Sequence, residues 1–199
     1  MLSINKNQHT SDLKIRHNLI KYIGKQYNNH PAKIIEEFSV CDGAARVDLA
    51  AVNGIMHGFE IKSDIDSLNR LPHQIELYGS VFDRVTLVVG ATHLYEAFNM
   101  IPEWWGVLVA RINKNGTVSF NEIRSPKKNR NVKIHSVVKL LWKEEAISVL
   151  EGIGFARGYK SKNREQICRK ITEELDLKTI STKVRESILF NRQGWKVGV

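Results

Sequence analysis

The sequence predicts an α/β (α+β) domain with a central mixed sheet flanked by helices, followed by a C-terminal helical appendage. Over residues 1–125, short apolar runs bounded by Gly, Asn-Gly or Asp-Gly alternate with segments of helical spacing. Residues 126–199 contain only helical patterns and a surplus of basic side chains. We therefore expect two regions, a core of residues 1–125 and a basic helical region of residues 126–199.

The first part of the core predicts one helix and three strands. Residues 11–28 place apolar side chains at helical spacings, and Ser11 or Thr10 can cap this helix. Asn53-Gly54 is a hairpin turn signal between the second and third apolar runs. The expected strands are 33–40, 45–52 and 55–63.

A second helix is expected after Asp64, where Asp66 or Ser67 can act as the cap. Its core stripe recurs at helical spacing and consists of Leu71, Ile75, Tyr78 and Phe82. The remaining core elements are strands at 84–90, 105–112 and 117–123 and a short helix at 92–100. A basic linker at 125–133 then leads to three helical patterns, at 136–153, 162–175 and 181–193.

The charge of the chain is unevenly distributed along the sequence. Residues 127–199 hold 17 of the 30 Lys and Arg but only 8 of the 21 Asp and Glu, so the whole formal excess of +9 lies there. A basic module beside a balanced, acid-containing one is the layout expected if the tail binds a polyanion on which the core acts. The alternative is that lysine-rich helices only keep the surface soluble.

Other classes of protein are disfavoured by composition. No apolar run approaches the roughly 20 residues that span a bilayer, and the polar N-terminus lacks an apolar signal core. We therefore expect a cytoplasmic protein without a membrane partner. The two cysteines, Cys41 and Cys168, lack metal-ligand spacing and are expected to be free thiols.

The segment GFEIKSD, residues 58–64, places Glu60 and Lys62 on one face of a strand. Asp48, on the preceding strand, joins that face only if the intervening turn has an odd length, as in a three-residue loop with Gly54 in the left-handed position. The far face should then enter the core through Val47, Leu49, Phe59 and Ile61. The alternative is a solvated pair of charges on an exposed strand.

Given that geometry, the residue types suit metal-dependent cleavage of a phosphodiester. Such hydrolysis needs a metal ion that neutralises phosphoryl oxygens and lowers the pKa of the attacking water. Mg²⁺ prefers oxygen ligands and keeps several waters, so the Asp48 and Glu60 carboxylates and the Ile61 carbonyl suffice. Lys62 would orient the water or stabilise negative charge in the transition state.

At these residues the chain resembles the PD-(D/E)xK nuclease superfamily. VDL-(11)-EIK, counted from Asp48 to Glu60, is similar to the D…ExK core, although Val47 replaces the proline of the eponymous motif. The stretch 36–90, with EIKSDIDSLNRLPHQ, resembles an uncharacterised bacterial branch with an EIKSDxDxLxRLxxQ signature. The resemblance implies a restriction-endonuclease-like core, covers about residues 12–125 well and covers the helical tail loosely.

The resemblance also implies further site residues. Gln74-x-x-x-Tyr78 resembles the QxxxY element of RecB-like nucleases, which implies a place for Gln74 beside the catalytic lysine, whereas core packing is favoured for Tyr78. Many members have an additional upstream acid, for which Glu37 is the first candidate and Asp12 the second, and we expect Glu37 to join the metal ligands. Independently of the resemblance, the candidate substrate-binding cations are Arg46, Arg70, Lys127, Lys128 and Arg130. Arg46 could instead pair with an acid, and the other four could lie on a solvated helix face or loop.

The sequence therefore predicts a Mg²⁺-dependent nuclease, with Mn²⁺ as a substitute ion. We expect it to act on DNA, as an endonuclease rather than an exonuclease. A homodimer is compatible with the sequence. RNA stays open as a substrate. The alternative is a non-catalytic DNA-binding or assembly protein on a nuclease fold.

Overall fold

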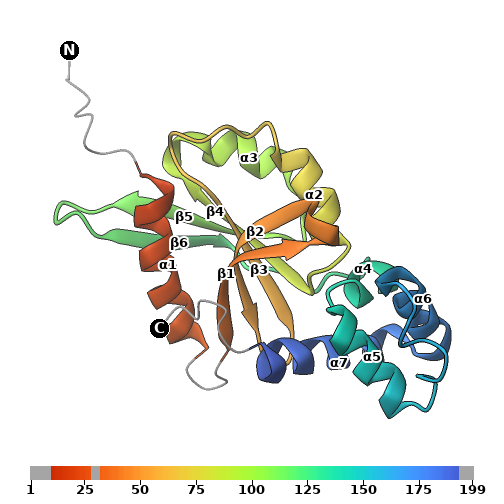
Figure 1. Cartoon of the computed structure of the whole chain (residues 1–199). Coiled ribbons are helices and arrows are strands. Elements are labelled where there is room, and N and C mark those ends of the chain that lie inside the picture. The colour runs from red at the N-terminus through yellow and green to blue at the C-terminus, as the bar shows by residue number, and fades with distance from the viewer. Residues whose placement is uncertain (1–9, 28–31, 193–199) are drawn as a thin grey trace.

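A six-stranded mixed sheet forms the centre of the computed structural model, which describes residues 10–27 and 32–192 (Figure 1). Strand order follows chain order, with parallel pairing from β3 to β5 and antiparallel pairing elsewhere. The strands are β1 (Lys33–Val40), β2 (Ala45–Val52), β3 (Met56–Lys62), β4 (Arg84–Gly90), β5 (Gly106–Ile112) and β6 (Val118–Arg124). The predicted α+β class and the positions of all six strands are confirmed.

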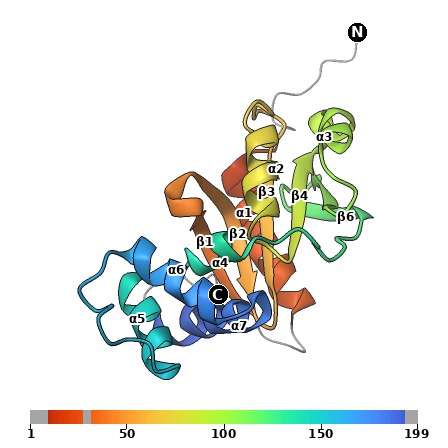
Figure 2. The same cartoon turned by 90° about the vertical axis from the view of Figure 1, so that its right-hand side faces the viewer.

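Helices lie on both faces of the sheet and at one end of the molecule (Figures 1 and 2). They are α1 (Asp12–Gln26), α2 (Leu71–Gly79), α3 (Leu94–Met100), α4 (Ile134–Val138), α5 (Lys143–Gly152), α6 (Arg164–Glu174) and α7 (Leu177–Glu186). The expected helices 11–28 and 181–193 end at residues 28 and 193, which lie outside the described residues. No helix within residues 10–27 and 32–192 is long and apolar enough to cross a membrane.

Each face of the sheet packs in its own hydrophobic cluster. The smaller cluster joins the buried stripe of α1 (Ile15, Leu19 and Ile23) to the sheet residues Leu49, Phe59 and Ile61, among others. The larger cluster lies on the opposite face and contains Tyr78, Phe82 and Trp105. It continues without a break into the C-terminal helices, through residues such as Val138, Ile171 and Val184. The helical tail therefore shares its core with the sheet.

Helix α2 begins later than the sequence suggested. Its first residue is Leu71, and residues 64–70 form a loop. Asp66 does not cap the helix, because its Oδ2 accepts hydrogen bonds from the main-chain N–H and the hydroxyl of Ser63, both at 2.7 Å. Arg70 occupies the N-cap position without a side-chain cap bond. This loop places Pro72 in the first turn of the helix, where its missing N–H is tolerated.

The expected helix 136–153 is two helices, α4 and α5, and a capping box between Trp142 and Glu145 begins the second. Arg192 is buried and pairs with the Glu145 carboxylate, Nε to Oε1 at 2.9 Å and Nη2 to Oε2 at 2.7 Å. Glu145 also accepts the N–H of Trp142 at 2.7 Å, which starts α5 at the next residue. Lys33 of β1 holds the same segment to the sheet, with its Nζ donating to the carbonyls of Ile188 and Arg192.

Asp64 ties three segments together at the end of β3. Its Oδ2 accepts the N–H and hydroxyl of Thr10 at 2.9 and 2.7 Å, and its Oδ1 accepts the N–H of Thr92 at 3.0 Å. Burial alone would raise the pKa of this carboxyl, but the hydrogen bonds from Thr10 and Thr92 outweigh it and lower the pKa to about 2. Gly90 allows this approach, since a Cβ there would lie 2.7 Å from the Asp64 nitrogen.

We expect Asp64→Asn to destabilise the protein at neutral pH by about 1 kcal/mol, a modest value because the carboxylate is partly exposed to screening solvent. The pKa is lower in the folded state, so the stabilisation is present above the ordinary carboxyl pKa and is lost as pH falls toward 2. Urea unfolding should show the gap between wild type and variant narrowing from about pH 5 to about pH 3. A gap that is constant with pH would contradict this assignment.

Candidate active site

The predicted catalytic residues meet in one cleft of about 820 Å³ at the junction of β2, β3 and α2. Of the residues singled out in the sequence, those lining it are Glu37, Arg46, Asp48, Glu60, Ile61, Lys62, Arg70 and Gln74, together with the second-choice acid Asp12. Lys127, Lys128 and Arg130 do not line it. Convergence of residues 12 to 74 in one cavity is the main feature of the site.

A three-residue turn sets the register on which the site depends. Val52 pairs with Met56, which leaves Asn53, Gly54 and Ile55 as the loop. Continuing this register places Asp48 opposite Glu60, as the odd-length alternative required. Gly54 does not adopt the expected left-handed conformation. Instead, the Asn53 side-chain oxygen accepts the N–H of Ile55 at 3.1 Å and closes the loop.

Strands β1 and β2 are distorted together beside the cleft. Glu37 has a left-handed backbone, with φ 53°, and the pairing of β1 with β2 passes over Glu37 and Asp48. Val47 packs in the larger cluster and Leu49 in the smaller one, although residues two apart in a regular strand share a face. The expectation that Val47 joins Leu49 behind the site is therefore wrong, because the alternation of faces reverses at Asp48.

Glu60 is buried, with 3% of its surface exposed, and three donors surround its carboxylate. Lys62 Nζ and Gln74 Nε2 donate to Oε1 at 2.7 and 2.6 Å. The Tyr78 hydroxyl lies 2.8 Å from Oε2 and 2.9 Å from the Arg46 carbonyl oxygen. Tyr78 is thus a core residue and a site residue at once, whereas the sequence favoured core packing alone. Burial and the negative charge of Glu60 raise the pKa of Tyr78, so its hydroxyl keeps its proton.

Asp48 is held by two donors on opposite sides of its carboxylate. Its Oδ2 accepts the main-chain N–H of Ile61 at 2.6 Å, and its Oδ1 accepts Arg16 Nη2 at 2.8 Å. Burial, and then the nearby charge of Glu60, raise the pKa of Asp48 to about 7, against the opposing effects of Ile61 and Arg16. The site therefore concentrates negative charge that these two donors only partly balance.

Arg16 is the functional-site residue that sequence reasoning missed. Its guanidinium contacts the Asp48 side chain and carbonyl, the Asp12 carboxylate and, at 2.7 Å, Glu37 Oε1. Burial opposes its charge, but the hydrogen bond that it donates to Asp12 and the charges of Asp48, Asp12 and Glu37 together raise its pKa. The available signal was the Asp12-x-x-x-Arg16 spacing on α1, which indicates a pair on one helix face but not what that face contacts.

Two of the candidate phosphate contacts, Arg46 and Arg70, line the cleft. Arg46 is 65% exposed, and its Nε pairs with Glu37 Oε2 at 2.6 Å. Glu37 thus lies between two arginines, and its expected part as a metal ligand stays a prediction. Arg70 lines the cleft at the start of α2.

Residues 127–130 lie at the far end of α2 from the cleft. Asn129 fixes this segment there, because its side chain donates to the carbonyls of Gly79 and Phe82 at 2.7 and 2.9 Å, and its N–H donates to Asp83. Lys127 also donates its N–H to the Trp104 carbonyl. The structure therefore does not bring the basic run Lys127, Lys128 and Arg130 to the catalytic candidates.

The oxygens at this site suit a hard cation such as Mg²⁺ or Mn²⁺. Asp48 and Glu60 supply two carboxylates, and the Ile61 carbonyl points to the same side of β3 as its N–H, toward Asp48. Gln74 Oε1 is buried beside Glu60 and has no hydrogen-bond partner. No three His, Cys, Asp or Glu side chains in the described part of the chain form a group that could hold a metal ion. The fit therefore requires water and main-chain ligands, as Mg²⁺ commonly uses.

We expect Glu60→Gln to cost about 3 kcal/mol of stability, because either amide orientation turns N–H groups toward a donor and leaves Lys62 without its carboxylate. Asp48→Asn should cost less, because burial and Glu60 already oppose the charge of Asp48. Urea unfolding in a metal chelator measures both. The exposed pair Lys160–Glu151 provides the control Glu151→Gln, which should change little. Equal losses for Glu60→Gln and this control would contradict the buried network.

Comparison with known proteins places the chain in a phage family. A family model described as Bacteriophage P4 protein cII matches residues 5–193. Protein cII of Enterobacteria phage P4 is 31% identical over 173 residues, which make up 86% of this chain and 62% of that protein. The chain thus spans less than two thirds of the length of this relative. No solved structure matches it. The chain belongs to the bacteriophage P4 protein cII family.

Proposed function

We propose that this protein is a metal-dependent nuclease with a restriction-endonuclease-like core, which hydrolyses phosphodiester bonds in DNA and cuts within the strand. The observation that carries the proposal is the meeting of Asp48, Glu60, Lys62 and Gln74 in one cleft. Asp48 and Glu60 lie opposite each other across the β2–β3 hairpin, so their carboxylates can act on the same group. A solvated surface pair would not be buried or surrounded by donors in this way.

Each side chain has a distinct part in the proposed reaction. The Lys62 ammonium is 4% exposed and fixed by Glu60, so it is placed to orient an attacking water or to stabilise charge on the phosphoryl oxygens. Gln74 and Tyr78 position the Glu60 carboxylate through the hydrogen bonds that they donate to it. Arg16 holds Asp48 toward the cleft and balances part of its charge.

Asp48, Glu60 and the Ile61 carbonyl would hold the metal ion. When bound, Mg²⁺ or Mn²⁺ supplies Lewis acidity toward the phosphoryl oxygens and a lower pKa for a coordinated water. After the larger effect of burial, the charge of Glu60 also raises the pKa of Asp48, and two carboxylates this close together favour a cation at this position.

A second candidate function is nucleic-acid binding without cleavage. The observation that favours it is that each of the four carboxylate oxygens of Asp48 and Glu60 accepts a hydrogen bond from the protein. Such a closed network can serve stability alone. Cleavage experiments separate the two functions.

Purified protein is incubated with supercoiled, linear, branched and single-stranded DNA, and with RNA, in Mg²⁺ or Mn²⁺. We expect nicking of supercoiled DNA, which only an endonuclease can produce. Lys62→Met and Asp48→Asn should lower the rate by about 100-fold or more, since each removes a group that acts on the transition state or holds the metal. Lys160→Met, at an exposed lysine of the tail, is the charge-matched control and should retain activity.

Circular dichroism verifies that each variant is folded. Equal cleavage by wild type and Asp48→Asn would assign the activity to a contaminant. Binding without cleavage of any substrate would favour the second candidate function, and cleavage of RNA alone would correct the substrate.

A further inference from the structure

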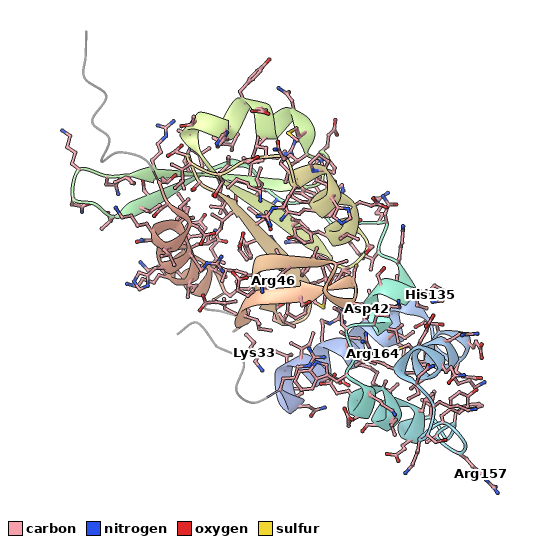
Figure 3. All side chains as sticks on the ribbon, turned by 45° about the horizontal axis from the view of Figure 1, so that its top comes forward. Lys33, Asp42, Arg46, His135, Arg157 and Arg164 are labelled. Atoms are coloured by element: carbon pink, nitrogen blue, oxygen red, sulfur yellow. The ribbon has the colours of Figure 1, made fainter. Side chains whose placement is uncertain are left out.

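A second cleft, of about 330 Å³, lies between the β1–β2 turn and the C-terminal helices. The turn, Cys41–Gly43, forms one wall, and residues from α4 to α6 form much of the rest. Ser39 and Gly43 line both this cleft and the catalytic cleft, so the two cavities lie on either side of the same turn. Figure 3 shows Asp42 of the turn beside Arg164 of the tail, with Arg46 farther along the strand.

The two clefts have opposite charge. Five carboxylates line the catalytic cleft, against three Lys or Arg: the acids are Asp12, Glu37, Asp48, Glu60 and Asp66, and the cations are Arg46, Lys62 and Arg70. One carboxylate, Asp42, lines the second cleft, against Lys139, Arg164 and Arg192. A nucleic acid near the catalytic carboxylates therefore gains its electrostatic attraction from elsewhere. The second cleft is the adjacent basic cavity.

Asp42 holds the cations of the second cleft in the free protein. Its Oδ2 accepts Lys139 Nζ at 2.8 Å, and its Oδ1 accepts Arg164 Nη2 at 2.6 Å. The hydrogen bond from Lys139 lowers the pKa of Asp42. Burial opposes this effect and the hydrogen bond from Arg164 adds to it, so the carboxylate stays charged. All three side chains are about two-fifths exposed, at 43%, 40% and 38% for Asp42, Lys139 and Arg164. Incoming anions can therefore reach this cluster.

Arg164 retains donor capacity beyond Asp42. Its Nη2 also donates to the Lys139 carbonyl, but its Nε is buried without a hydrogen-bond partner. Arg192, the third cation of the lining, is 2% exposed, and its charge is balanced by Glu145, which accepts two of its hydrogen bonds. Lys139 and Arg164 are thus the two cations of this cleft that can exchange one anionic partner for another.

We propose that the second cleft binds a backbone phosphate of the nucleic acid, and that Asp42 occupies the place of that phosphate in the free protein. A phosphate group presents oxygen acceptors to a guanidinium and an ammonium as a carboxylate does. On binding, phosphate oxygens replace the Asp42 carboxylate as the acceptors of Arg164 and Lys139. The nucleic-acid strand then runs along the shared turn from this cleft to the catalytic cleft. The inference rests on the proposed nucleic-acid substrate but not on its cleavage.

The test measures binding of a fluorescein-labelled DNA duplex of about 20 base pairs, in EDTA, across a salt series from about 50 to 200 mM. Asp42→Asn should tighten binding roughly threefold, because it removes the competing charge. The substitution is well matched, since Asp42 has φ 57° and asparagine tolerates this left-handed conformation. If the ion pairs served stability alone, this variant would not tighten binding.

Lys139→Gln and Arg164→Gln should each weaken binding and reduce the log–log salt slope by about 0.9 for the lost phosphate contact. Arg157→Gln removes the same charge at the far tip of the tail, as Figure 3 shows, and should leave the slope close to wild type. Thermal unfolding verifies the fold of each variant. Lys139→Gln is the more conservative of the pair, because Lys139 makes one side-chain contact with Asp42 and Arg164 also binds a main-chain carbonyl.

Two outcomes would overturn the inference: an Asp42→Asn protein that binds no tighter than wild type, or a folded Lys139→Gln protein with an unchanged salt slope. Absence of any DNA binding by wild type would overturn it as well. Failure of the nuclease proposal is distinguishable, because a protein that binds with these variant effects but never cleaves in Mg²⁺ or Mn²⁺ retains the phosphate site and lacks only the catalysis.

Discussion

The placement of two carboxylates opposite each other, the half-buried Asp48 and the buried Glu60, is the constraint on which the surrounding structure depends. Like charges in a medium of low dielectric constant repel strongly and lose their hydration, so each must find donors. Glu60 finds Lys62, Gln74 and Tyr78, and Asp48 finds the Ile61 N–H and Arg16. These donors come from β3, α2 and α1. The electrostatic requirement therefore fixes how helices from both faces of the sheet approach its centre.

The same requirement is visible in the backbone. Glu37 adopts a left-handed conformation beside Asp48, and the alternation of side chains along β2 reverses there. A regular strand would place every second residue on one face, and could not direct Asp48 toward Arg16 while keeping Val47 and Leu49 in separate clusters. Strain of this kind is retained where surrounding contacts over-determine it, and it is frequent at functional sites.

The tail is joined to the sheet by both packing and charge. The larger hydrophobic cluster passes from the sheet into α4–α7. Lys33 and Asp42 of the core form hydrogen bonds with residues of the tail, and Asn129 of the tail forms one with the core. A charged tail attached by a flexible linker would act on nucleic acid only through its local concentration. Here the contacts of the β1–β2 turn give the tail a fixed position beside the cleft that holds Asp48 and Glu60. Under the proposed function, a polyanion bound to the tail would therefore have a defined path to that cleft.

The sequence by itself determined the elements and much of the site. Period-two and continuous apolar runs identified all six strands, since strand patterns are local, and the D…ExK spacing identified Asp48, Glu60 and Lys62, which line the cleft. It also identified the odd-length turn as the condition for Asp48 to share a face with Glu60. It could not give the conformation of Gly54, which depends on how the Asn53 side chain closes the loop.

Tertiary structure alone decided the rest, because those features depend on contacts between residues distant in the chain. Arg16 joins Asp48 from 32 positions away, and Arg192 binds Glu145, at the start of α5, across 47 positions. The basic run at 127–130 lies far from the cleft because Asn129 bonds the end of α2. Local patterns record propensity and periodicity, whereas the partner of a charged side chain is set by which surfaces pack together.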